Sequence, residues 1–360
     1  ILGWGFAPWS GGPFSWLDML GAAYAAERCD ALSETYGPRF ACPQLLRDMA
    51  RHIVEQTGYI YGNYGMHQSS LLRVAATLRD TTGQPSSQDM VDWVMDNEDY
   101  DLYVYMPLYD ALYNLVGRDG CATESPQYNN GWTRNLTHLA DLLQLNGVDV
   151  TQIERFQQLY EWAPRMICAG EFVPALGDAF TISHRAQLCT FDNYLFAYKT
   201  YKKPLYAHIL RGLEPDRKSN LFARPVSVDE LDKVAAVGSI GHTSQHLAEY
   251  RQAILQNANV DQPLAVSMHY GQNQTHDHRD KMQLDIYAHG ASLIPDFGYP
   301  ETANANDPRR GGFFHHTISH NTVMVDERRQ QASHEGYCIA FDPGGCAPTW
   351  RRTAKGPTHR

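Results

Sequence analysis

Paired cysteines, an excess of basic residues and long apolar runs are all missing from this 360-residue sequence. The seven cysteines are odd in number and spread out, without a C-x-x-C pair, which argues against a disulfide scaffold and a cysteine-ligated zinc site. Acidic residues outnumber basic ones by 40 to 30, for a formal charge of −10. This balance argues against nucleic acid as a partner, and an anionic substrate needs a local cationic or metal-lined cleft.

The sequence also has no apolar run near the roughly 18 residues of a membrane span, and its start lacks the basic-then-apolar layout of a signal peptide. We therefore expect a soluble chain. It begins at Ile1 rather than methionine and ends on a polar stretch, 355–360. These ends lead us to expect a fragment, whose export signal would lie outside it.

Residues 1–50 are predicted to form a short helical segment of their own. A glycine-rich stretch at 3–13 precedes two helical patterns, over 22–35 and 43–56, each followed by a glycine that suits a helix end. The motifs at 3–13, 17–21, 37–40 and 43–49 resemble the C-terminal end of the fatty-acid oxidation complex alpha subunit, a 3-hydroxyacyl-CoA dehydrogenase. No G-x-G-x-x-G follows a strand pattern, so the resemblance implies a helical fold and no catalytic residue.

The remaining chain changes from helix patterns to strand patterns near residue 223. Within 51–222, leucines and alanines recur at helix spacing, for example at Leu136, Leu139 and Leu143. Within 223–360, the short alternating runs predict antiparallel strands; these runs are 263–270, 282–287 and 321–325. Because one core rarely serves a chain of this length, we expect an α+β multidomain protein.

Histidines and aspartates cluster between these strand patterns. If the segment before Met282 is extended, then His276, His278 and Asp280 point to one side, because side chains alternate along a strand. Asp296 and His320 each adjoin an apolar strand pattern. Two histidines and one carboxylate, with a fourth position for water or substrate, make an accepted zinc ligand set. A histidine-rich loop that only solvates itself explains the H-x-H-x-D pattern equally well.

The order of the motifs around this cluster resembles the β-sandwich domain of heparinase II/III-like polysaccharide lyases. The motifs that carry the resemblance are Tyr270-Gly271, 276–281, 285–290, 295–300 and 319–326. The resemblance implies that His278, Asp296 and His320 bind zinc and that His276 faces the substrate. It also implies that zinc is mainly structural, and Asp280 is then a candidate hydrogen-bond partner of a ligating imidazole.

Such lyases pair the sandwich with an incomplete α/α toroid, which supplies a catalytic tyrosine and an asparagine or histidine. The string Asp119-Gly120, Glu124 and Tyr128 resembles the family's tyrosine motif and implies that Tyr128 is catalytic. A loop tyrosine is the alternative, because turn-forming residues surround it.

The family's asparagine-containing helix start resembles the segment 61–67. Asn63 is the better match, and His67 lies four residues later, so both share a face if the segment is helical. A helix-capping asparagine is the alternative. The resemblance therefore implies a truncated sandwich over 223–360 after a toroid-like helical domain over 51–222.

The implied reaction is β-elimination on an anionic uronate polysaccharide, of the alginate or glycosaminoglycan type. Asn63, with His67 or His276, would stabilise charge on the uronate carboxylate. Tyr128 would transfer both protons, or Tyr128 and His276 would divide the transfers. The resemblance implies a periplasmic or secreted protein. Three alternatives stay open: a non-catalytic remnant, a zinc-dependent hydrolase that activates water, and a fatty-acid oxidation component.

Overall fold

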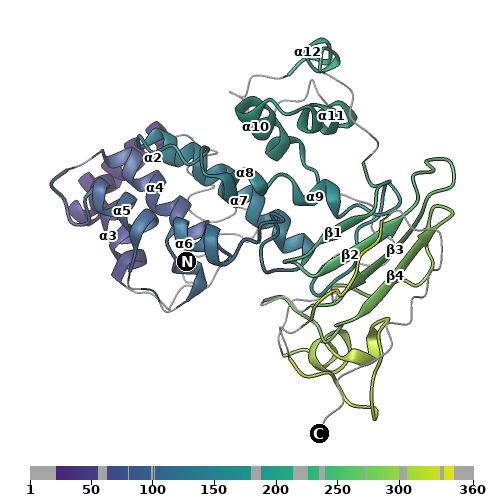
Figure 1. Ribbon diagram of the computed structural model, residues 1–360. Coiled ribbons are helices and arrows are strands. Elements are labelled where there is room, and N and C mark those ends of the chain that lie inside the picture. The colour runs from purple at the N-terminus through teal and green to yellow at the C-terminus, as the bar shows by residue number, and fades with distance from the viewer. Residues whose placement is uncertain are drawn as a thin grey trace, which may run out of the picture. The chain divides into compact units, whose positions relative to one another are not determined.

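The chain forms two compact units in this computed structural model (Figure 1). The helical unit comprises Ile1–Ala163 and Gln187–Val237, and the sheet unit comprises Pro164–Ala186 and Gly238–Arg360. The structure describes residues 22–55, 63–79, 81–98, 100, 102–179, 188–213, 226–234, 240–271, 275–299, 306–332 and 336–343. The glycine-rich stretch predicted over 3–13 lies outside these residues. Residues 164–186 group with the strands and not with the helices that precede them in sequence.

The helical unit is built from short amphipathic helices. They are α2 (Ala22–Tyr36), α3 (Cys42–Glu55), α4 (Met66–Leu78), α5 (Ser87–Asp96), α6 (Leu108–Asn114), α7 (Pro126–Leu145), α8 (Glu154–Gln158), α10 (Phe191–Tyr201), α11 (Pro204–Gly212) and α12 (Val228–Asp232), with the 3-10 turns η2 (Pro38–Phe40) and η3 (Tyr103–Tyr105). The helices predicted over 22–35 and 43–56 are confirmed by α2 and α3. No helix in the described part of the chain combines the length and apolar character needed to cross a bilayer.

Helix α7 illustrates how the local sequence fixes an element. Pro126 occupies its first turn, where the missing N–H has no helical partner to lose. Leu136, Leu139 and Leu143 then follow at helix spacing, and all three are buried. Helix α4 packs against this helix. The leucines that recur at helix spacing in the sequence are therefore the residues that α7 buries in the core.

The sheet unit contains a five-stranded antiparallel sheet with the strands in sequence order. The strands are β1 (Gln245–Leu247), β2 (Gln252–Gln256), β3 (Leu264–His269), β4 (Gln283–Ala288) and β5 (Ala291–Ser292). The strands predicted over 263–270 and 282–287 are confirmed by β3 and β4. In the register, His269 lies between Gln252 on β2 and Gln283 on β4. Helix α9 (Trp162–Arg165) spans the point at which the two units divide.

The strand predicted over 321–325 is wrong. This segment makes an isolated bridge between Val325 and Arg328, and Asn321 accepts a main-chain hydrogen bond from Leu284 of β4 at 3.0 Å, but the segment belongs to none of the strands described above. Val323 and Val325 are 74% and 68% exposed. A strand needs a continuous series of main-chain hydrogen bonds to a neighbour, and within the described residues the main-chain bonding to β4 stops at Asn321.

The two faces of the sheet differ in polarity and in burial. The buried face carries the polar residues Gln252, Ser267, His269, Gln283 and Asp285, together with Ile254, Ala265 and Tyr287. The opposite face carries Leu255, Val266, Met268, Leu284 and Ile286, which are half-buried or exposed. The more polar face is thus the better buried one, which is the reverse of what hydrophobicity alone predicts.

Residues 164–179 cover the polar face of the sheet. Phe172 stacks on Tyr287 of β4 with ring centroids 5.1 Å apart. Gln283 donates through Nε2 to the carbonyl oxygen of Ala175 at 3.2 Å. The main-chain N–H of Ala169 donates to Oε1 of Gln256 at 2.9 Å. These contacts bring the end of this segment, Gly177-Asp178, to the histidines that precede β4.

Candidate functional site

Two predicted site residues lie in the irregular segment that leads into β4. This segment is not the strand that the alternation argument assumed, because His276 and Met282 have left-handed φ angles of 52° and 65°. Alternation nevertheless holds over its middle, where His278 and Asp280 are 1% and 3% exposed and their neighbours are half-buried. His276 is half-buried. The structure therefore places His278 and Asp280 together inside the unit.

His320 lies beside both His278 and Asp296. Its ring centroid is 5.2 Å from that of His278. Its Nδ1 is 2.8 Å from Oδ2 of Asp296, and both side chains are almost fully buried. The main-chain N–H of Gly298 donates to the other Asp296 oxygen at 2.8 Å. The three residues predicted as ligands, far apart in sequence, thus lie next to one another in one buried cluster.

Two overlapping sets of three side chains have the spacing needed to hold a metal ion. One set is His278, Asp280 and His320, and the other is Asp178, His278 and His315, with ligand atoms within 4.8 Å of one another in each set. Asp280 thus stands where the sequence analysis placed Asp296, and the assignment of Asp296 as a ligand stays a prediction.

Asp178 and His315 were missed by the sequence analysis. His315 adjoins His316, and a histidine pair close to His320 was a usable signal. Asp178 precedes the cluster by 100 residues in sequence. No motif marks it, so only the fold reveals it.

The first set fits a cation by the chemistry of its donors. His278 Nδ1 and His320 Nε2 are buried and have no hydrogen-bond partner. A buried polar atom without a partner destabilises the fold, whereas a nitrogen lone pair that ligates a cation is satisfied. Burial alone would raise the pKa of Asp280, but the nearby imidazoles of His320, His269 and His278 lower it below its usual range. Two imidazoles and an ionised carboxylate suit zinc and other transition ions.

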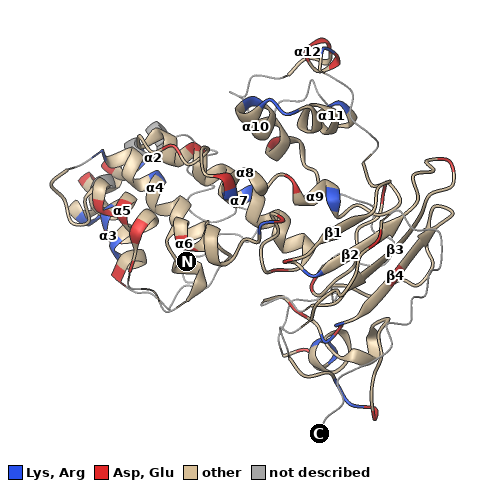
Figure 2. Ribbon diagram, in the orientation of Figure 1, with Lys and Arg blue, Asp and Glu red and all other residues tan. Residues whose placement is uncertain are grey.

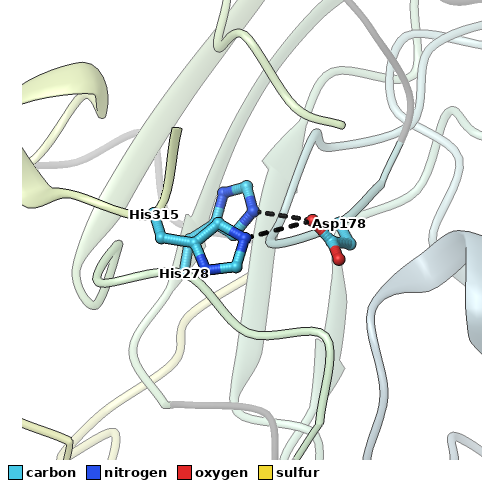
Figure 3. Close-up of side chains that lie close together, drawn as sticks. All are labelled: Asp178, His278 and His315. Atoms are coloured by element: carbon cyan, nitrogen blue, oxygen red, sulfur yellow. Dashed lines mark hydrogen bonds and ion pairs between the residues drawn. The ribbon is translucent and has the colours of Figure 1, made fainter. Parts of the chain in front are cut away.

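Asp178 faces the imidazoles of His278 and His315 (Figure 3). Its Oδ1 lies 3.0 Å from Nε2 of His278 and 3.6 Å from Nε2 of His315. Arg310 donates to its other oxygen at 2.5 Å. Burial alone would raise the pKa of Asp178, but the hydrogen bond with His278, the nearby imidazole of His315 and the charge of Arg310 hold it well below its usual range. This carboxylate is therefore ionised at neutral pH.

Asp285 is the only Asp, Glu, Lys or Arg in the five strands, whose arrows are almost wholly tan in Figure 2. Ser267 and Gln283 donate to its carboxyl group at 3.3 Å and 3.2 Å. Burial, followed by the charge of Asp296, raises the pKa of Asp285 to about 7. The carboxyl group therefore resists ionisation beside the metal-binding set.

We expect Asp285→Asn to stabilise the metal-free protein at pH 8 and to change little at pH 4. Between the ordinary pKa of an aspartate and about 7, ionisation favours the unfolded chain, so stability falls with rising pH by about 1.4 kcal/mol per unit. Above pH 7, ionisation of Asp285 lowers the free energy of unfolding by at most about 4 kcal/mol. Asparagine cannot ionise, so the variant avoids this loss. Urea unfolding with a chelator at both pH values measures the difference.

Asp261→Asn is the matched control for that prediction, because Asp261 is exposed in the loop between β2 and β3. It should leave the pH profile of stability unchanged. An Asp285→Asn variant that is less stable than the native protein at pH 8 would show that the ionised carboxylate stabilises the fold.

Tyr128 lies in the first turn of α7 and is half-buried. The sequence analysis left open a loop position, and the structure excludes it. One turn later, Trp132 stacks on Tyr64 with ring centroids 4.6 Å apart. Its indole N–H donates to the buried Glu124 at 3.2 Å.

Asn63 and His67 do not share a helix. Helix α4 has Gly65 as its N-cap and begins at Met66, so Asn63 precedes it in a turn in which Met66 N–H donates to the Asn63 carbonyl at 3.3 Å. The left-handed Gly65, with φ of 90°, directly precedes the helix, so the condition under which Asn63 and His67 would share a helix face is not met. His67 is buried in the first turn, with its ring 5.0 Å from that of Tyr105.

The predicted site residues therefore fall into two groups. Asn63, His67 and Tyr128 belong to the helical unit, and the stack of Tyr64 on Trp132 ties their segments to each other. His276 and the metal-binding residues belong to the sheet unit. The catalytic and metal-binding roles of these residues stay predictions.

Comparison with protein families gives one match. Residues 254–341 match the family model described as Heparinase II/III-like, C-terminal. This range contains His276, His278, Asp296 and His320, so the resemblance stated for the sheet unit is confirmed. Nothing in the comparisons concerns the dehydrogenase resemblance of residues 1–50.

Solved structures give the same result for the fold. The Heparinase III-BT4657 gene product matches with a TM-score of 0.58 at 14% identity, over 83% of this chain and 42% of its own. A crystal structure of heparinase III matches with a TM-score of 0.56 at 14% identity, over 78% and 42%. Heparan sulfate lyase HepC from Pedobacter heparinus matches with a TM-score of 0.52 at 11% identity, over 85% and 45%. The chain spans less than half the length of each, and the likeness concerns the fold.

Proposed function

We propose that the protein is a polysaccharide lyase that cleaves uronate-containing polysaccharides, of the alginate or glycosaminoglycan type, by β-elimination. The observation that carries the proposal is the buried His278, Asp280 and His320 cluster with its two unpartnered imidazole nitrogens. It lies within the range that matches the heparinase II/III-like model. The similar structures named heparinase III and heparan sulfate lyase support the same reaction class.

The proposed reaction removes the C5 proton of a uronate, forms a C4–C5 double bond and breaks the bond from C4 to O4, which takes up a proton. The C5 proton is weakly acidic, so charge on the adjacent carboxylate needs hydrogen-bond donors. We assign that role to Asn63, with His67 or His276. Tyr128 is assigned the proton transfers, with His276 as the residue that shares them. No residue needs to form a covalent bond with the sugar.

Zinc is the metal that we propose for the cluster. His278 and His320 would hold it, together with Asp296 as predicted from the sequence or with Asp280 as the spacing indicates. When bound, the ion would cross-link the segment before β4 to the segment that ends at His320. Its role in this proposal is structural, because fixing these segments also fixes His276.

We propose that the helical unit is part of an incomplete α/α toroid and that the sheet is one layer of a β-sandwich. The half-exposed apolar face of the sheet supports this, because sandwiches bury such faces against a second sheet. A periplasmic or secreted location accompanies the proposal. Residues 1–50 contribute no catalytic residue to it.

The proposal is tested by incubating the protein with alginate, heparan sulfate and hyaluronan. We expect ultraviolet absorbance from new C4–C5 double bonds on at least one of them, with reducing ends formed in equal number. New reducing ends without that absorbance would instead identify a zinc-dependent hydrolase. A folded, metal-loaded sample that cleaves none of a wider set of uronates would identify a non-catalytic remnant.

A further inference from the structure

We propose that Asp178 is a positioning residue for the metal centre, which fixes the tautomer and orientation of His278 from a segment 100 residues upstream. The inference rests on the metal centre in the proposed function. It assigns a role to the dipeptide Gly177-Asp178, which carries no recognisable motif.

The hydrogen bond between Asp178 and His278 determines which imidazole nitrogen is left for a metal. Oδ1 of Asp178 lies 3.0 Å from Nε2 of His278, and both side chains are fully buried. An ionised carboxylate only accepts hydrogen bonds, so Nε2 carries the proton and donates it. Nδ1 then keeps its lone pair, and Nδ1 is the nitrogen that lacks a partner. Carboxylates commonly orient metal-ligating histidines in this way.

Gly177 forms a hydrogen bond with Asp280, which belongs with His278 to the first metal-binding set. Its main-chain N–H donates to Oδ2 of Asp280 at 2.9 Å. The N–H of Asp178 donates to the carbonyl oxygen of His276 at 2.8 Å. Consecutive residues of one segment thus hold three residues of the loop that leads into β4.

Only glycine allows this close approach. Gly177 has a φ of 57°, and a Cβ atom there would lie 2.3 Å from the carbonyl oxygen of His276. Both the backbone conformation and the contact exclude a larger residue. The dipeptide is therefore built to bring one main-chain donor and one carboxylate against the loop.

The alternative is that Asp178, His278 and His315 themselves hold a second cation. Arg310 speaks against it, because its guanidinium lies 2.5 Å from the carboxylate that this cation would need and would repel it. His278 also could not offer Nε2 to that cation while Nδ1 binds the first, unless it lost its proton. The geometry therefore assigns Asp178 and Arg310 to one network that supports His278, with Nε2 of His315 3.6 Å from Oδ1 of Asp178.

Zinc titration of Asp178→Asn tests the proposal. We expect one zinc per chain in the native protein and affinity about 10–100-fold weaker in the variant. Asp277→Asn is the matched control, because Asp277 lies on the same loop and pairs with Arg279; its affinity should stay within about twofold of native. His315→Ala should still bind one zinc, because in this proposal it touches Asp178 and not the metal.

Three results would overturn the inference. They are native affinity in Asp178→Asn, two zinc ions per native chain, and loss of zinc in His315→Ala. If Asp178→Asn does not fold, the nitrogen-15 spectrum of His278 in the native protein decides: the proton must be on Nε2, and a proton on Nδ1 contradicts the proposal. If the zinc titrations give the expected results but the protein cleaves no uronate, the lyase proposal is wrong and the role inferred for Asp178 is retained.

Discussion

Replacing His320 with alanine is expected to abolish metal binding, from one zinc per chain to none after dialysis. The substitution removes the imidazole whose Nε2 has no other partner. It also deprives the buried Asp296 carboxylate of its contact at 2.8 Å. Removing one partner of a buried pair costs about 3–5 kcal/mol, so we expect the unfolding free energy to fall by that amount. Elemental analysis and urea unfolding measure the two effects.

His208→Ala is the matched control for this substitution, because His208 is an exposed histidine on α11. It should keep zinc and stability at native levels. Stoichiometric zinc in His320→Ala would remove His320 from the ligand set.

The same assay can decide between Asp296 and Asp280 as the carboxylate ligand. Asp280 has the spacing, whereas Asp296 contacts Nδ1 of His320. That contact would leave Nε2 for the metal, as Asp178 leaves Nδ1 of His278. Substitution of the carboxylate that binds zinc should abolish zinc binding. Substitution of the carboxylate that only supports a ligand should lower the zinc affinity without abolishing binding.

Replacing Tyr128 with phenylalanine is expected to lower kcat on the cleaved uronate by about 10²–10⁴-fold, with KM changed by only a few fold. The phenol oxygen is the group to which we assign the proton transfers. Phenylalanine keeps the ring and its packing, so the loss should concern the chemical step. Initial rates from the absorbance of the new double bond measure it.

Tyr109→Phe provides the control, because Tyr109 is an exposed tyrosine on α6 in the same unit. It should retain native kcat, and circular dichroism should show that both variants are folded. Native turnover in Tyr128→Phe would require another group, with His276 as the next candidate, to move the protons.

The elements that the sequence predicted are those whose signal is local. Glycines after 22–35 and 43–56, and the alternation in β3 and β4, were enough to locate two helices and two strands. The prediction was wrong over 321–325, where alternation is present but the main-chain hydrogen bonding to β4 stops at Asn321 in the described chain. The condition under which Asn63 and His67 would share a helix face is not met, because α4 begins after the left-handed Gly65.

The sequence by itself singled out His278, Asp280, Asp296 and His320, because H-x-H-x-D and the later aspartate and histidine form a recognisable ordered set, but it did not single out Asp178 or His315. Tertiary structure alone decided which nitrogen of His278 is free. The deciding atoms belong to Asp178, which reaches the cluster because residues 164–179 cover the polar face of the sheet. Periodicity and motifs encode contacts within a few residues, whereas a hydrogen bond across 100 residues exists only once the whole unit has packed.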